Sequence, residues 1–323
     1  MKILYATKPG SYVRRSGGRI VVTHKEEELA SVPLAALESV VLFGPVQIST
    51  QAMQTLLGGG ISLVMLSSGG RFLGSLSSGL PKNVFVRLAQ QESASQNKLA
   101  LMNAREVVAT KTWSQKQALA RWRRNHWLHA DVSDFTDQMA LLEQTRTVND
   151  MQLAEARLAK IYYGYFGRAI PPPFEWQGRT RRPPRDPANA LLSLIYMCLV
   201  SEAVGACYAV GLDPFVGFLH QLEYGRPSLA LDLIEPLRPA WCDHLVLKLL
   251  QHEEFSGDDF YYGKTTGCRL QNAGVKKFFQ IFAEWVDQGA NSPRRTVARL
   301  ARQTARSVQQ KTPFEWQKSL EAG

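Results

Sequence analysis

The sequence has few cysteines and no long uninterrupted apolar run. Its 323 residues include four cysteines, which are far apart and form no C-x-x-C pair. A zinc site or disulfide scaffold is therefore not expected, and a reducing cytoplasm is the expected location. No run approaches the roughly 18 apolar residues of a membrane span, and the first apolar run ends at Pro9 and Gly10. We therefore expect neither a membrane anchor nor a signal peptide.

Familiar catalytic motifs are also missing. The sequence contains no G-x-S-x-G, no H-E-x-x-H and no dinucleotide-binding fingerprint. The tripeptide GKT at 263–265 suggests a phosphate-binding loop, but five residues separate Gly257 from Gly263 where that loop has four. The residues between these glycines are acidic and bulky, so we interpret GKT as a chance match.

Acidic residues are absent from two long stretches of a chain whose formal net charge is +10. No acid occurs between Glu106 and Asp131, or between Asp287 and Glu315. A surface helix normally mixes both signs, so a stripe of one sign predicts a face that contacts phosphates, with a solvated face as the alternative. The first stretch alternates tryptophans with Lys111, Lys116, Arg121, Arg123 and Arg124. The second carries, at helical spacing, Arg295, Arg299, Arg302 and Arg306.

The pattern of the chain changes near residue 83. Residues 1–82 contain short β-branched segments separated by glycine turns, and the Gly17-Gly18 pair indicates a hairpin. One helix is expected there, at residues 50–60. Residues 83–323 have long amphipathic patterns instead. The predicted fold class is therefore α+β, with a small β-sandwich-like N-terminal domain followed by a larger all-α domain.

A basic, proline-rich loop interrupts the helical part. Residues 169–189 include six prolines, which deny the segment a helix or a central strand. The loop is suited to contact a phosphate backbone, although a flexible solvated connector explains it equally well. Pro187 then opens a helix that runs to about Val210 and ends at Gly211. The arginines of the loop are Arg179, Arg181, Arg182 and Arg185.

The most unusual stretch, residues 211–239, reads GLDPFVGFLHQLEYGRPSLALDLIEPLRP. It places His220, Asp232 and Glu235 in apolar sequence, where ionised groups are costly unless they are paired, hydrogen-bonded or bound to a metal. A divalent cation is the most economical partner. Ser228 can cap a helix that puts both acids on one face, although the alternating leucines also permit a strand.

A further acid, Glu155, lies in a predicted helix that begins near Asp150, its expected N-cap. The segment reads DMQLAEARLAKIYYGYFG. On periodicity alone Glu155 belongs on the surface.

Three segments together resemble the universal spacer-acquisition integrase of CRISPR systems, the Cas-one family. They are residues 211–239, the segment RTRRPPRDPANALLS at 179–193, and Glu155 within its A-E-A-R context. The resemblance implies that Glu155, His220 and Glu235 form the catalytic, metal-binding set and that Asp232 is auxiliary. Such a set suits Mg²⁺ or Mn²⁺.

The resemblance also implies a function and partners. Members are metal-dependent DNA endonucleases and transesterases that insert short foreign DNA fragments into the CRISPR repeat array, in the prokaryotic cytoplasm and without a membrane. They act as homodimers, expected here to associate through the β-domain, and a Cas-two dimer bridges two such dimers. The basic loop and the arginine stripe would bind DNA. The alternatives are a nuclease of branched or single-stranded DNA without an integration role, and a non-catalytic nucleic-acid-binding scaffold.

Overall fold

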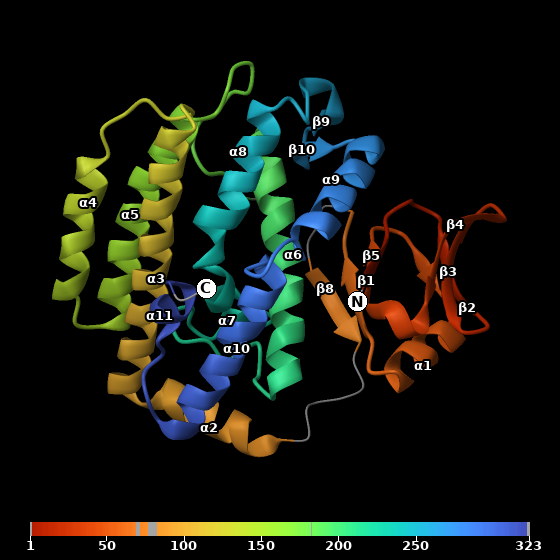
Figure 1. Ribbon diagram of the computed structural model, residues 1–323, viewed down its shortest axis with the longest axis horizontal. Helices are drawn as coiled ribbons and strands as arrows, with labels where there is room; N and C mark the ends of the chain where they lie inside the picture. Colours follow the sequence, from red (N-terminus) through yellow and green to blue (C-terminus); the bar gives the residue numbers. More distant parts are fainter. Residues whose placement is uncertain (1, 69–71, 77–82, 182, 322–323) are drawn as a thin grey trace. The chain divides into compact units, whose positions relative to one another are not determined.

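The computed structural model describes residues 2–68, 72–76, 83–181 and 183–321. The chain divides into two compact units (Figure 1). One is rich in strands and combines Met1–Leu80 with Asp259–Trp285, and the other is helical and combines Pro81–Asp258 with Val286–Gly323. The predicted α+β class is confirmed. The predicted division at residue 82 differs in one respect, because residues 259–285 return to the strand-rich unit.

Two four-stranded sheets form the strand-rich unit, in the orders β1-β5-β7-β8 and β4-β3-β2-β6. In the first, β8 is antiparallel to β7 and the other pairs are parallel. In the second, β2 and β3 form the predicted hairpin around Gly17, whose φ is 56°. The strands are β1 (Lys2–Ala6), β2 (Tyr12–Ser16), β3 (Arg19–His24), β4 (Glu27–Pro33), β5 (Leu37–Phe43), β6 (Gln47–Ile48), β7 (Ser62–Leu66) and β8 (Phe72–Leu76).

Side chains of both sheets share one apolar core. Val13 and Ile20 of the second sheet and Val40 of the first are fully buried in it. The expected single helix is α1 (Thr50–Gly58), which contributes Leu56 to the same core. The unit is thus a small sandwich held by burial of apolar area, which contributes about 25 cal/mol per Å².

The returning segment consists of a hairpin and a helix. Strands β9 (Phe260–Gly263) and β10 (Gly267–Leu270) are antiparallel, and α9 (Asn272–Trp285) follows. Phe279 of α9 lies 5.0 Å, between ring centroids, from both Tyr5 and Phe43. The GKT tripeptide ends β9 and enters the hairpin turn, so its resemblance to a phosphate-binding loop is indeed accidental.

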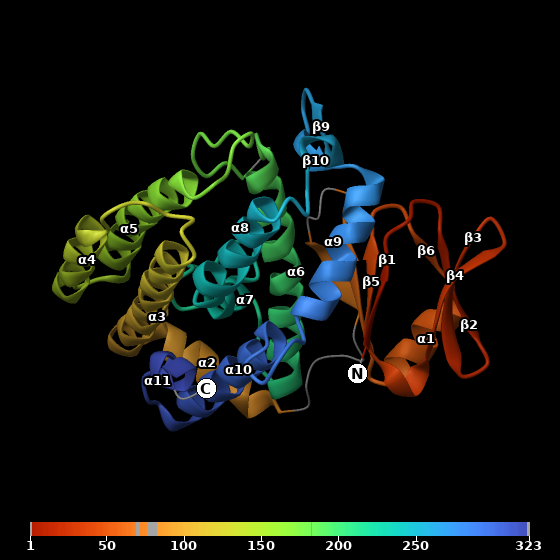
Figure 2. The same cartoon turned by 45° about the horizontal axis from the view of Figure 1, so that its top comes forward.

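The helical unit is built around α6 (Pro187–Val210), which packs against α7, α8 and α10 (Figure 2). By length and composition this is one helix that could cross a membrane, but 72% of its most apolar window is buried. We therefore interpret it as a core helix. The other helices are α2 (Val84–Ser95), α3 (Asn97–Arg124), α4 (Ser133–Ala140), α5 (Val148–Arg168), α7 (Ser228–Ile234), a π-helix (Arg238–Asp243), α8 (His244–Gln251), α10 (Pro293–Gln310) and α11 (Trp316–Glu321).

The ends of the two helices that flank the basic loop have clear local causes. At α6, Asp186 accepts a hydrogen bond from the backbone of Asn189, and Gly211 ends the helix with φ 87°, as predicted. At α5 the predicted N-cap, Asp150, is wrong. Thr147 is the N-cap, and its hydroxyl and the Asp150 carboxylate accept hydrogen bonds from each other's backbone N–H groups at 3.1 and 3.0 Å.

Candidate active site

A buried carboxylate holds the loop that carries His220. Asp232 on α7 is 0% exposed. Its Oδ2 accepts hydrogen bonds from the backbone nitrogens of Phe218 and Leu219, at 2.7 and 3.1 Å, and its Oδ1 accepts one from His220 at 3.1 Å. Three backbone N–H groups thus converge on this one carboxylate. Asp232 therefore holds the backbone of residues 218–220 in place.

The same carboxylate orients the imidazole. Oδ1 of Asp232 lies 2.6 Å from Nδ1 of His220. When Nδ1 carries the proton and donates it to this oxygen, Nε2 is left with a free lone pair. Nε2 points toward Glu235, whose Oε1 lies 3.9 Å away. The His220 side chain is thus presented as a metal ligand or as a proton acceptor.

Helix α7 resolves the choice between helix and strand for residues 228–234 in favour of a helix. Glu235 directly follows the last residue of α7. Asp232 and Glu235 are therefore about one helical turn apart, and Asp232 contacts Nδ1 of His220 while Glu235 faces Nε2. The predicted cap at Ser228 is wrong, because its hydroxyl donates to the carbonyl of Gln221 at 3.0 Å instead. Ser228 thereby ties the first turn of α7 to the loop that carries His220.

Two cations from different parts of the helical unit contact Glu235. Nζ of Lys111, on α3, lies 2.6 Å from Oε2 of Glu235 and also forms an ion pair with Glu155 on α5. Arg238 forms an ion pair with Oε1 of Glu235. Burial acts to raise the pKa of Glu235, but Arg238 and Lys111 outweigh it and hold the pKa well below its ordinary value.

The positive charge of Lys111 is stabilised in turn by the two carboxylates. Burial acts to lower the pKa of Lys111, but Glu235 and Glu155 outweigh it and raise the pKa above its ordinary value. The Lys111 side chain is only 11% exposed, whereas that of Glu155 is 24% exposed. Glu155 therefore lies on the solvent side of the cluster and is not the free surface residue that its periodicity suggests.

The structure thus links Glu155 to Glu235 through Lys111 and places His220 beside Glu235. As the side chains stand, no three His, Cys, Asp or Glu residues within the described ranges are arranged to hold a metal ion. The donor set nevertheless fits a divalent cation, since it offers two carboxylates and an imidazole nitrogen. Oε2 of Glu235 is buried and forms no hydrogen bond, although it lies at ion-pair distance from Lys111. A metal would fit here if the Lys111 ammonium moved away.

A second polar network lies next to this cluster. Arg238 lies over the ring of Tyr196, 4.8 Å from its centroid. The hydroxyl of Tyr196 donates to Asp243, and so does that of Tyr162 at 2.8 Å. Burial raises the pKa of Asp243 to about 7 despite these hydrogen bonds. Sequence reasoning missed Lys111 as a site residue, and it gave no role to Asp243 or to Arg238, although Arg238 lies in the stretch 211–239. These contacts depend on tertiary packing.

Comparison with known proteins identifies the chain. A family model described as CRISPR associated protein Cas1 matches residues 4–284. The chain belongs to the Cas1 family. This confirms the resemblance to Cas-one. Two of the relatives of this chain are named CRISPR-associated endonucleases.

The first relative, Cas1 2 of Rhodospirillum rubrum, is 35% identical over 274 residues, which cover 80% of this chain and 79% of that protein. The second, Cas1 3 of Thermus thermophilus, is 34% identical over 262 residues, covering 80% and 77%.

Two solved structures share the fold. A casposase bound to integration product superimposes with a TM-score of 0.87 at 22% identity, covering 98% of this chain and 94% of that one. A CAS1 protein from Thermotoga maritima gives a TM-score of 0.86 at 21% identity, covering 97% and 99%. The predicted plan of a strand-rich front and a helical remainder is therefore the Cas1 plan.

The basic loop of this Cas1 chain points some arginines inward and others outward. Arg179 is half-buried and donates to Asn189 Oδ1 at 2.7 Å, and its guanidinium lies 5.5 Å from the centroid of the Tyr196 ring. Arg181 and Arg185 are exposed. Arg182 lies outside the described residues. Among the predicted DNA-contacting arginines of this loop that the structure describes, Arg181 and Arg185 are more exposed to solvent than Arg179.

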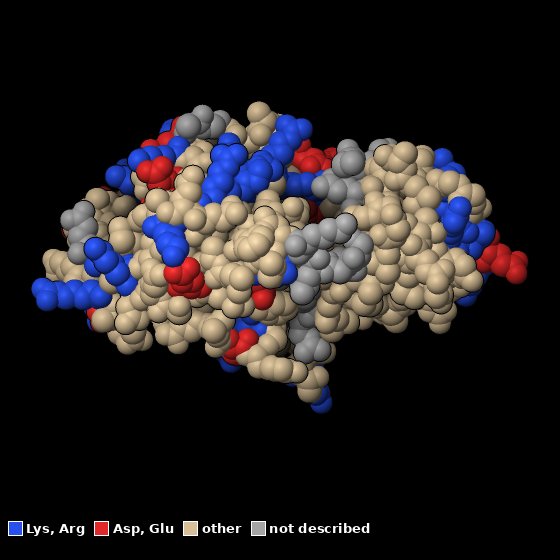
Figure 3. Space-filling model, turned by 90° about the horizontal axis from the view of Figure 1, so that it is seen from below, with Lys and Arg blue, Asp and Glu red and all other residues tan. Residues whose placement is uncertain are grey.

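Helix α10 presents the predicted arginine stripe. Arg295, Arg302 and Arg306 are exposed, and Arg299 is half-buried with a 3.4 Å hydrogen bond to Asn291. Among the residues described, none of the four forms an ion pair. On the face seen in Figure 3, Lys and Arg side chains form several groups over the helical unit, with Asp and Glu side chains beside some of them. The stripe is therefore free to meet an anion.

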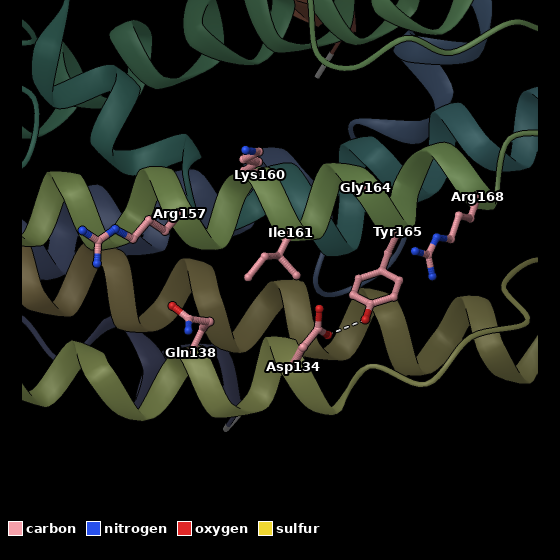
Figure 4. A pocket seen from close by; sticks show the side chains of 8 residues that line it. All are labelled: Asp134, Gln138, Arg157, Lys160, Ile161, Gly164, Tyr165 and Arg168. Atoms are coloured by element: carbon pink, nitrogen blue, oxygen red, sulfur yellow. Dashed lines mark hydrogen bonds between the residues drawn. The ribbon is translucent and has the colours of Figure 1, made fainter.

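A further basic hollow, of about 470 Å³, lies between α4 and α5 (Figure 4). Its α5 wall includes Arg157, Lys160 and Arg168, and the hydroxyl of Tyr165 donates to Asp134 across it. Glu155 belongs to the same helix. Sequence reasoning missed this surface, because its cations are spread along a helix of mixed charge.

Proposed function

We propose that this Cas1 chain is a metal-dependent DNA endonuclease and integrase that inserts short foreign DNA fragments into a CRISPR repeat array. The observation that carries the proposal is that Lys111 links Glu155 to Glu235 while Nε2 of His220, whose ring is oriented by buried Asp232, faces Glu235. Relatives named as endonucleases support it. So does the fold shared with a casposase bound to integration product.

The residues of this chain have distinct tasks in the proposed reaction. Glu155, Nε2 of His220 and Glu235 would hold Mg²⁺ or Mn²⁺, and Asp232 keeps the proton on Nδ1 so that Nε2 can bind. When bound, such an ion would act as a Lewis acid toward a DNA 3′-hydroxyl, or toward water in cleavage, and would neutralise charge on the phosphodiester. Arg238 holds Glu235 in place.

DNA is the proposed substrate and a principal partner. Exposed cations that face no acid release counterions when they meet phosphates, and this drives association. The α10 stripe meets that description, as do the exposed arginines of the loop. The proposed DNA-contacting residues remain Arg179, Arg181, Arg182, Arg185, Arg295, Arg299, Arg302 and Arg306.

We also propose the protein partners that the family resemblance implies. The chain would form a homodimer through its strand-rich unit, and a Cas2 dimer would bridge two such dimers. A chain of a complex titled Cas6-RT-Cas1–Cas2 shares the fold, with a TM-score of 0.83 at 20% identity. Light scattering at micromolar concentration should give a dimer, and a monomer would contradict this. The cysteines are buried and free, which suits the proposed reducing cytoplasm.

An integration assay tests the proposal. The purified protein and its Cas2 partner are given Mn²⁺, a supercoiled plasmid that contains CRISPR repeats, and a short duplex with 3′-hydroxyl ends. Joined product supports an integrase, whereas fragments alone indicate a nuclease without an integration role. Glu155→Ala and His220→Ala should abolish joining and leave DNA binding largely intact, while Asp137→Ala, at an exposed position of α4, should behave as wild type. Normal joining by either site variant would refute the assignment.

A further inference from the structure

A lysine ammonium lies between two of the three candidate metal ligands. Nζ of Lys111 contacts Glu155 and lies 2.6 Å from Oε2 of Glu235. Lys111 is itself buried, and the residues around it on α3, such as Val107 and Val108, are buried as well. A buried ammonium is costly unless it is paired, so this lysine depends on the two carboxylates as much as they depend on it.

Both glutamates of the cluster are paired with cations without a metal. Lys111 and Arg238 are the two cations, and Glu155 and Glu235 are the two anions. His220 is held by Asp232, which has its own backbone donors. A divalent ion bound beside the Lys111 ammonium would place two cations within a few ångströms in a poorly solvated site, where like charges repel strongly. The ammonium and the ion therefore exclude each other.

We propose that Lys111 is an exchangeable internal counter-ion, which fills the cation position in the metal-free protein and leaves it when a divalent ion binds. The inference rests on the metal site of the proposed function. The long, flexible lysine stem permits the exchange, because the ammonium can swing while α3 stays in place. The more exposed Glu155 side of the cluster offers the way out toward solvent.

The exchange has a measurable consequence for metal affinity. A ligand that binds only a minor conformation has its apparent affinity reduced by the fraction of protein in that conformation. Minor conformations are typically populated at about 0.1–10%. Competition by Lys111 would therefore weaken metal binding by about tenfold or more, and in return it would keep the carboxylates paired while no metal is present.

Calorimetric titration with Mn²⁺ tests this in variants. Lys111→Met keeps the length of the side chain and removes its charge, so it should bind Mn²⁺ about tenfold or more tightly than wild type. Without metal its melting temperature should fall, and Mn²⁺ should raise it by more than in wild type. Lys116→Met, at an exposed position of the same helix, should match wild type in both measurements. Unchanged or weaker binding by Lys111→Met would overturn the proposal.

Amine labelling of the wild-type protein tests the exchange without any substitution. Acetic anhydride followed by peptide mass spectrometry should show that Mn²⁺ increases acetylation of Lys111 relative to Lys116. Labelling of Lys111 that stays constant while Mn²⁺ binds would also overturn the proposal. Failure of the proposed metal site itself looks different, since neither wild type nor Lys111→Met would then bind Mn²⁺.

Discussion

Nδ1 of His220 and Oδ1 of Asp232 lie 2.6 Å apart, and this pair decides which nitrogen of the imidazole is free. The same carboxylate accepts three backbone hydrogen bonds from residues 218–220. Asp232 thus acts on the site through His220 and its loop, and Glu235 is the acid that faces Nε2. This arrangement separates the roles of two acids that lie three residues apart.

Asp232→Asn should weaken Mn²⁺ binding by about 10- to 100-fold, because the amide no longer fixes the proton of His220 on Nδ1. Calorimetric titration measures the effect. The matched control is Asp137→Asn, since Asp137 is exposed on α4 and distant in sequence. Wild-type affinity in Asp232→Asn would mean that the pair has no orienting role.

Gly217→Ala should destabilise the protein, by about 1–3 kcal/mol as for other overpacked sites. A Cβ atom there would lie 2.8 Å from the carbonyl oxygen of His220 and from the backbone of Ser228. Neither can retreat, because Asp232 and the Ser228 hydroxyl tie this loop to α7. Chemical denaturation measures the loss. Gly205→Ala, in α6 with open space at its Cβ, should be neutral or stabilising.

Asp243 should make stability fall as pH rises. Burial raises its folded-state pKa to about 7, above the ordinary 3.8, so the folded protein holds a proton that the unfolded chain has lost. Its contribution is therefore present below about pH 4 and is lost at about 1.4 kcal/mol per pH unit up to about pH 7. Denaturation of wild type and Asp243→Asn across this range isolates the effect, because the other groups are common to both. Parallel stability curves would contradict it.

Arg302→Gln combined with Arg306→Gln should weaken DNA binding and lower its salt dependence. Each phosphate contact contributes about 0.9 to the slope of log K against log salt, so losing two should reduce the slope by about 1.8. Fluorescence anisotropy at several salt concentrations measures it. Arg14→Gln with Lys25→Gln removes two exposed charges from the strand-rich unit and serves as the control. An unchanged slope would exclude this face of α10 from the DNA contact.

The sequence by itself determined the features that depend on neighbouring residues. Paired glycines indicated the β2–β3 hairpin, and Pro187 and Gly211 marked the two ends of α6. Helix ends and tight turns can be read from the sequence because they are set by local hydrogen bonds and backbone angles. The GLDP to EPLRP stretch and two further segments predicted the family, and the stretch contains two of the three predicted ligands, His220 and Glu235.

Only the tertiary structure decided which distant groups meet. It returned residues 259–285 to the strand-rich unit through the packing of Phe279, and it placed Lys111 between two carboxylates, one of them 44 residues away. The sequence presents Lys111 as one of several cations in a basic stretch. What makes this lysine different is the desolvation of its ammonium and the acids brought to it by α5 and α7, and both arise only when the helices pack.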